Sequence, residues 1–242
     1  MNHPGNQTMT ESGSDSSAAS KLVRRIHHSE SDGVKAIWDE LGNIPLPETD
    51  HLSALFEPDP RLKEMAADIE RLGQSCFDKP PVDFEFNRRM ALQITDDWIL
   101  HLGRLTFNVS RANRLKLFWT IKEVFGEDAR MSGFFYYPPG GFKEWHTDFE
   151  DPQMDPEKHW RIYLIKSAED EKSWFHYLDP KTNEIERIYD YDGHLNFFNL
   201  VEDQPLWHGV YSHTHRYSLG IKLGDEAIKN LLDLTDIREA VG

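Results

Sequence analysis

The chain has 242 residues, which is enough for one substantial domain with a sizeable hydrophobic core. Its 42 acidic residues against 27 basic ones give a formal net charge of −15, so it would repel phosphate backbones, and nucleic acid is disfavoured as a partner. The single cysteine, Cys76, excludes an internal disulfide framework and is typical of a reducing compartment, and no apolar run is long enough to span a membrane. We therefore expect a cytoplasmic protein without a membrane segment.

The first half of the chain is predicted to be a polar tail followed by helices. Residues 1–20 have the composition of a disordered tail, and residues 21–126 are predicted to form a helical region that supports the core. Apolar spacing of three and four residues, with glycine at the ends, predicts four helices. These helices cover 34–41, 62–72, 90–103 and 111–126.

The second half is predicted to be a β domain. Between 127 and 224, short aromatic and β-branched runs alternate with turn residues, a pattern typical of a sandwich or a jelly-roll barrel. Eight strands are expected, at 133–138, 143–149, 160–167, 173–179, 185–191, 195–201, 205–211 and 215–223. A last helix lies in residues 225–242. The expected fold class is mainly β with a helical N-terminal part (α+β), in which helices pack on a double-stranded β-helix core of jelly-roll or cupin-like type.

The segment "KEWHTDF" holds the first candidate site. Residues two apart in a strand point to the same face, so His146 and Asp148 are predicted to project together. An imidazole and a carboxylate are two metal ligands, and a third must come from another strand. The downstream segment offers His208, His213 and His215. The tripeptide alone is common and indicates little.

The residues that follow these histidines distinguish between them. Arg216 and Ser218 are two apart on the last predicted strand, so a guanidinium and a hydroxyl share one face and can bind a carboxylate together. His208 precedes Arg216 by eight residues, which leaves room for a turn and a return strand, whereas His213 and His215 fall in that turn as solvated residues. The predicted ligands are therefore His146, Asp148 and His208, a two-histidine, one-carboxylate triad that leaves positions open as in non-heme Fe(II) oxygenases.

Three segments, "YPPGGFKEWHTDF", "RIYLIK" and "GHLNFFNLVEDQPLWHGVYSHTHRYSLGIKL", resemble the core of the Fe(II)/2-oxoglutarate-dependent dioxygenases, specifically the prolyl-hydroxylase-like branch. The resemblance covers roughly residues 133–223. It implies Fe(II), 2-oxoglutarate as cosubstrate and O2, with no catalytic residue beyond the metal centre. It also implies that Arg216, helped by Ser218 and Tyr163, binds the far carboxylate of 2-oxoglutarate, and that Tyr137 lies beside the cosubstrate.

The resemblance further implies hydroxylation of a C–H bond in an amino acid, a peptide or a small metabolite, with release of succinate and CO2. A carboxylate at Asp148 favours hydroxylation, or a related desaturation or cyclisation, since halogenating relatives have a small residue there. Trp145 and Trp160 are candidate substrate contacts, although tryptophans at these places are more often core rings. The acidic segment 148–158 is either substrate-facing or a solvated face.

Two alternatives stay open. A cupin-like metalloenzyme that does not use 2-oxoglutarate would share the triad but give Arg216 no special role. A non-catalytic jelly-roll binding module would need neither.

Overall fold

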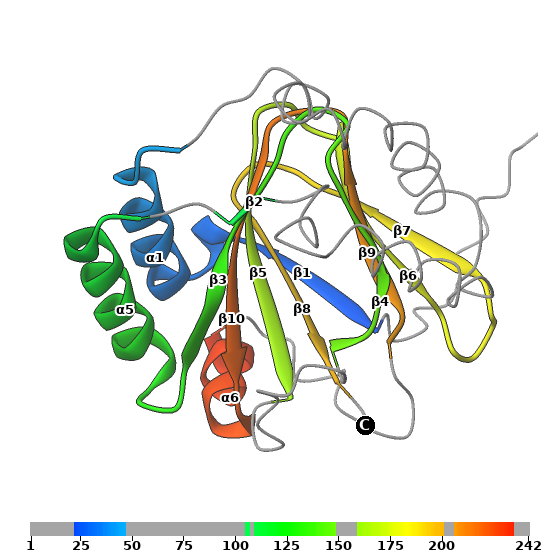
Figure 1. Ribbon diagram of the computed structural model, residues 1–242. Helices are drawn as coiled ribbons and strands as arrows, with labels where there is room; N and C mark the ends of the chain where they lie inside the picture. Colours follow the sequence, from blue (N-terminus) through cyan, green and yellow to red (C-terminus); the bar gives the residue numbers. More distant parts are fainter. Residues whose placement is uncertain (1–21, 47–104, 107–108, 149–158, 201–205, 235–242) are drawn as a thin grey trace, which may run out of the picture.

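The computed structural model describes residues 22–46, 105–106, 109–148, 159–200 and 206–234, which form two antiparallel sheets (Figure 1). The larger sheet has the strand order β1-β8-β5-β10-β3-β2, and the smaller has the order β4-β9-β6-β7. The strands are Val23–His27 (β1), Leu105–Thr106 (β2), Arg130–Tyr137 (β3), Phe142–His146 (β4), Trp160–Ser167 (β5), Ser173–Leu178 (β6), Ile185–Tyr189 (β7), His194–Asn199 (β8), His208–Ser212 (β9) and Arg216–Leu223 (β10).

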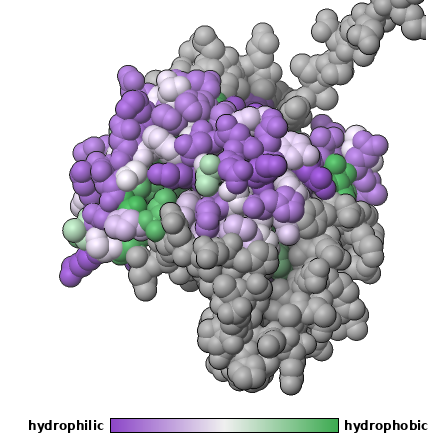
Figure 2. Space-filling view, turned by 90° about the horizontal axis from the view of Figure 1, so that it is seen from above, coloured by the Kyte–Doolittle hydropathy of each residue, from purple (hydrophilic) through white to green (hydrophobic). Residues whose placement is uncertain are grey.

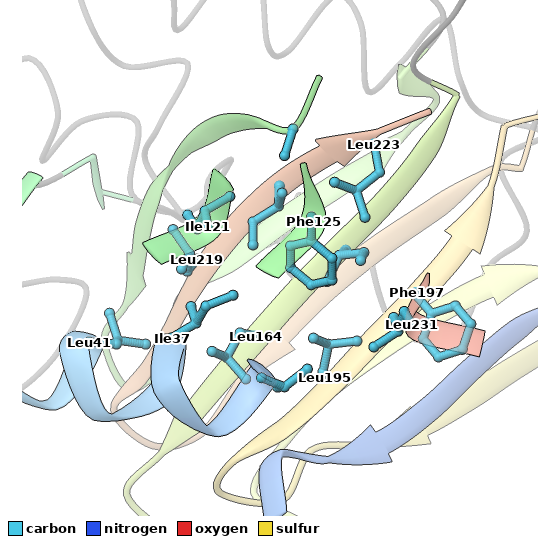
Figure 3. Close-up of a cluster of buried hydrophobic side chains, with 14 of the residues drawn as sticks. Ile37, Leu41, Ile121, Phe125, Leu164, Leu195, Phe197, Leu219, Leu223 and Leu231 are labelled. Carbon is cyan, nitrogen blue, oxygen red and sulfur yellow. The ribbon is translucent and has the colours of Figure 1, made fainter. Parts of the chain in front are cut away.

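A helical layer covers one face of the larger sheet (Figure 1). It consists of α1 (Asp32–Gly42), α5 (Arg111–Phe125) and α6 (Asp225–Leu234), and a short 3-10 helix, η1 (His28–Glu30), precedes α1. Ser31 caps the N-terminus of α1, because its hydroxyl accepts a hydrogen bond from the backbone N–H of Val34. Apolar side chains of the helices pack on those of the sheet in Figure 3. Each fully buried Leu, Ile or Phe contributes about 1.5–3 kcal/mol, so this layer fixes the sheet from behind.

One face of strand β10 contacts the apolar cluster beneath the helices, called here the helix-side cluster, and the other face points to the interior between the two sheets. Because successive side chains of a strand point to opposite faces, Leu219 and Ile221 join the helix-side cluster while Arg216 and Ser218 point the other way. A second apolar cluster draws residues from both sheets. Its buried members are Val23, Tyr137, Phe175, Tyr177, Phe198, Leu200, Leu206 and Val210. The candidate site lies beside this second cluster.

The eight predicted strands are all present as β3 to β10. The helices predicted over 34–41 and 111–126 are present as α1 and α5, and α6 begins the predicted last helix. The predicted tail, the helices over 62–72 and 90–103, Cys76 and residues 149–158 lie outside the described residues. The antiparallel β architecture is consistent with the expected jelly-roll or cupin-like class.

The prediction for residues 21–126 was wrong in one respect, because this region also contains strands. Val23–His27 forms β1, which pairs antiparallel with β8, and Leu105–Thr106 forms β2, which pairs with β3. The sequence "VRRIH" lacks strict apolar alternation, and its strand is defined by pairing with a distant partner. The edge position of both strands explains the weak local signal.

The described residues on the face shown in Figure 2 are mostly hydrophilic, in agreement with the acidic composition. Among the described residues, the large hydrophobic side chains that remain exposed are Leu115, Trp119 and Tyr189. No helix in the described part of the chain has the length and apolar character needed to cross a membrane.

Candidate metal centre and carboxylate pocket

Two paired strands bring the candidate histidines together. His146 is the last residue of β4 and His208 is the first of β9, and they are direct partners in the antiparallel register. Their ring centroids are 4.2 Å apart. Two residues separated by about 60 positions in the sequence therefore become neighbours through one strand pair.

Asp148 reaches the same place by a different route from the predicted one. The prediction placed Asp148 on the strand with His146, but β4 ends at His146 and Asp148 lies beyond it. Its carboxylate Oδ1 is nevertheless 3.8 Å from Nε2 of His146. One ligand atom from each of His146, Asp148 and His208 lies within 4.8 Å of the others. The chain turn after β4, and not strand alternation, brings the carboxylate back to the histidines.

Hydrogen bonds fix which nitrogen each histidine presents. Nδ1 of His146 lies 2.7 Å from the carbonyl oxygen of Glu144, and Nδ1 of His208 lies 2.9 Å from that of Leu206. A carbonyl oxygen can only accept, so each Nδ1 carries the hydrogen and each Nε2 keeps its lone pair for a metal. Burial lowers the pKa of His208, although the nearby Asp148 acts to raise it. Burial therefore favours the neutral, ligating form of His208.

The donor set fits a first-row divalent metal. Two imidazoles and one carboxylate are the facial arrangement typical of non-heme Fe(II) sites, whereas sites with oxygen ligands alone favour Mg²⁺ or Ca²⁺. His208 is fully buried, and the side chains of His146 and Asp148 are 22% and 19% exposed. A metal held there would keep a side open to a ligand.

Arg161 was not predicted and holds the candidate carboxylate ligand. Its Nε donates a hydrogen bond to Oδ2 of Asp148 at 3.1 Å, and its side chain on β5 is only 2% exposed. Asp148 then presents Oδ1 toward His146. A signal existed in the sequence, because Arg161 and Tyr163 are two apart on the predicted strand and so share a face.

The candidate cosubstrate residues line one pocket with the two histidines. Tyr137, Tyr163, Arg216 and Ser218 all lie on its wall. The remaining lining residues are Lys143, His146, Phe175, His208 and Val210. The guanidinium carbon of Arg216 is 5.0 Å from the ring centre of Tyr137, a cation–π contact. A guanidinium, a hydroxyl and the two histidines of the candidate triad in one pocket can bind a molecule that carries a carboxylate at some distance from its metal-binding end.

Asp190 is a buried acid that the sequence did not single out. Its Oδ2 accepts a hydrogen bond from Nε of Arg216 at 2.7 Å, and from the hydroxyl of Ser173 at 2.9 Å. Nothing local in "ERIYDYDG" marks it, since the residue follows β7 and meets Arg216 only through the fold.

The structure does not bring the candidate substrate tryptophans to this pocket. Trp145 is buried with its ring on the edge of His176, because adjacent residues of β4 face opposite sides. Trp160 belongs to the helix-side core and donates its ring N–H to Asp225. His213 and His215 fall in the turn between β9 and β10, as predicted, where His215 contacts the hydroxyl of Tyr136.

No protein-family model matches this sequence, and no curated protein matches it. Similar solved structures include a prolyl-4-hydroxylase from Pseudomonas putida, which is 20% identical with a TM-score of 0.33. That similarity covers 47% of this chain and 61% of the other. A 2OG-Fe(II) oxygenase family protein from Burkholderia pseudomallei is 14% identical with a TM-score of 0.31, covering 47% and 52%.

A prolyl hydroxylase from Trichoplax adhaerens, in complex with a peptide fragment of the hypoxia inducible factor oxygen degradation domain, is 14% identical with a TM-score of 0.31. That similarity covers 52% of this chain and 56% of the other. The matched region spans between about half and three fifths of these three structures. On this chain, each of the three similarities covers about half of the residues.

Proposed function

We propose that this protein is an Fe(II)- and 2-oxoglutarate-dependent oxygenase. The observation that carries the proposal is the shared pocket, in which His146 and His208 of the triad and the buried pair Arg216 and Ser218 line one cavity. A metal triad alone would suit many divalent-metal enzymes. A buried guanidinium on the same wall adds the means to bind the distal carboxylate of a metal-chelating oxo acid.

His146, Asp148 and His208 would hold the iron, through Nε2 of each histidine and Oδ1 of the aspartate. When bound with 2-oxoglutarate and O2, the iron supplies the oxidising chemistry, which converts 2-oxoglutarate to succinate and CO2 and places an oxygen atom on a C–H bond. Arg216, Ser218 and Tyr163 bind and orient the C5 carboxylate. Phe175 and Val210 give the pocket an apolar wall, which limits water near the reacting groups.

The substrate that we propose is an amino acid, a peptide or a small metabolite, hydroxylated at an unactivated carbon. Asp148 favours this outcome over halogenation, because its carboxylate occupies the ligand position. We propose residues 127–224 as the catalytic core, with strands β3 to β10 as its double-stranded β-helix and residues 225–242 as a closing helix. The buried Trp145 and Trp160 are no longer proposed as substrate contacts, since neither lines the pocket.

The test is an anaerobic titration of the Fe(II)-loaded protein with 2-oxoglutarate, monitored by the visible charge-transfer band of the chelate. We expect a saturable band in the wild-type protein. In Arg216→Gln, which keeps a donor for Asp190, we expect 2-oxoglutarate affinity to fall roughly 10- to 100-fold while iron affinity stays close to wild type.

Arg130→Gln is the matched control, because Arg130 lies at the exposed start of β3 and its guanidinium contacts backbone carbonyls there. Iron binding without a band in the wild-type protein would favour the metalloenzyme that does not use 2-oxoglutarate. Absence of iron binding would favour the non-catalytic module. Equal 2-oxoglutarate affinity in Arg216→Gln and in the control would show that Arg216 does not bind 2-oxoglutarate.

A further inference from the structure

A buried acid lies directly behind the pocket arginine. The side chain of Asp190 is 0% exposed and that of Arg216 is 2% exposed, so the two charges form an ion pair away from solvent. A buried charge is tolerated only when it is paired and hydrogen-bonded. Asp190 does not line the pocket and is not one of the candidate metal ligands. Its place in the fold therefore calls for a role that acts through Arg216.

The contact uses one particular nitrogen of the guanidinium. Asp190 accepts from Nε of Arg216 at 2.7 Å, and this is the hydrogen bond that the guanidinium makes within the described part of the chain. A carboxylate that paired with both terminal nitrogens would occupy the end of the side chain. Binding at Nε instead leaves the terminal nitrogens as the part of Arg216 that can meet a ligand in the pocket.

Asp190 is itself held from both sheets. The hydroxyl of Ser173 on β6 donates to its Oδ2 at 2.9 Å, and Nδ2 of Asn196 on β8 donates to its Oδ1 at 3.4 Å. Its backbone N–H also donates to the carbonyl of Ser173 at 2.8 Å. The carboxylate is thus fixed by the smaller sheet through Ser173 and by the larger sheet through Asn196. A group fixed in this way can set the position of the side chain that it binds.

We propose that Asp190 is a positioning residue for the 2-oxoglutarate site. Its hydrogen bond fixes the position of the Arg216 guanidinium in the pocket. The distance between the guanidinium and the metal triad is then fixed, and so is the distance at which a ligand carboxylate can bind. Asp190 also neutralises the buried guanidinium before the ligand arrives. The consequence is selectivity for the length of the oxo acid, with 2-oxoglutarate favoured over its homologues that are one methylene shorter or longer. This inference rests on the proposed function.

The experiment compares wild type, Asp190→Asn and Asp192→Asn as Fe(II)-loaded full-length proteins. Asp192 is the matched control, because it lies two residues away, loses the same charge and accepts a hydrogen bond from Ser167 outside the pocket. Dissociation constants for 2-oxoglutarate, oxaloacetate and 2-oxoadipate come from the anaerobic visible band, and iron affinity is measured separately. Thermal unfolding of each metal-free protein reports stability.

For Asp190→Asn we expect 2-oxoglutarate binding about tenfold weaker, unchanged iron affinity, and a smaller preference for 2-oxoglutarate over the two homologues. In turnover, KM for 2-oxoglutarate should rise while kcat changes little. For Asp192→Asn we expect wild-type values. A merely structural role predicts a lower melting temperature with unchanged ligand affinity and selectivity, and that result would overturn the inference. Tighter binding of 2-oxoglutarate would overturn it as well.

Ser173→Ala keeps the test decisive if Asp190→Asn does not fold. This variant removes one hydrogen bond to Asp190 and leaves both charges in place. We expect the same changes in ligand affinity and selectivity at a smaller size, and their absence would contradict the inference. If the wild-type protein binds iron but gives no band, the proposed function fails and this inference fails with it. A wild-type band together with unaffected variants rejects this inference alone.

Discussion

Gly209 offers a direct test of how the candidate metal site is packed, because it follows His208 in β9. A Cβ atom at this position would lie 2.4 Å from Nε2 of His176 and 2.9 Å from the backbone carbonyl oxygen of Lys143. Gly209 pairs with His176 on β6, while Lys143 belongs to β4 on the other side of β9. The added methyl group of Gly209→Ala would therefore overlap with atoms of both neighbouring strands, one of which carries His146.

The size of the effect follows from these distances. Ordinary van der Waals contact begins at 3.4 Å, so the Lys143 carbonyl must retreat by several tenths of an ångström. Overpacking of this kind costs about 1–3 kcal/mol. For a domain of this size about 2 kcal/mol lowers the melting temperature by roughly 4–8 °C. Because β4 carries His146 opposite His208, we also expect metal affinity to fall about tenfold, since such sites tolerate only about 0.5 Å of misplacement.

The assay is calorimetric unfolding of the metal-free proteins, followed by titration with Fe(II) under anaerobic conditions. Gly42→Ala is the control, because Gly42 ends α1 and a Cβ there meets nothing within 4 Å. That variant should melt at or slightly above the wild-type temperature. If Gly209→Ala melts within about 1 °C of wild type and binds iron equally well, the close packing of β4, β9 and β6 inferred here is wrong.

Two further predictions concern pH and metal. Burial lowers the pKa of His176 to about 3 from 6.5. Below pH 6.5 the unfolded chain therefore binds a proton that the folded chain does not bind. The free energy of unfolding is expected to fall as the pH falls from 6.5 toward 3. Between pH 7 and 5, His176 should lower the free energy of unfolding by about 2 kcal/mol. In urea unfolding, His176→Leu should lack this part of the pH dependence. Parallel plots of unfolding free energy against pH for the two proteins would argue against a role of His176. Asp148→Ala should weaken iron binding at least tenfold, because an anionic ligand is removed, and undiminished iron binding would count against the triad.

Strand alternation allowed much of the β domain to be predicted. The strand predicted over 160–167 is β5 with the same limits, because its aromatic and β-branched run is bounded by clear turn residues. The common face of Arg216 and Ser218 follows from the same rule and holds in the structure. The same rule also places Trp145 on the face opposite to His146, so the sequence already contained the reason why this ring does not reach the pocket.

Contacts between distant segments could not be predicted in the same way. Asp190 meets Arg216 only because β7 ends beside β10 in space, and no local pattern records that meeting. Asp148 lies after the end of β4, so its approach to the histidines depends on a turn and on Arg161. Strand β1 depends on pairing with β8. In each case the partner lies far away in the sequence or the chain leaves regular structure.

The two histidine rings take their orientation from peptide carbonyls two residues earlier, at Glu144 and Leu206, whereas Asp148 takes its orientation from the side chain of Arg161. A point substitution can delete a side chain but cannot delete a peptide carbonyl. The histidine half of the centre is therefore robust to sequence drift around it, and the aspartate half is not. A substitution at Arg161 removes the donor that orients Asp148, whereas substitutions at Glu144 or Leu206 leave both carbonyl acceptors in place.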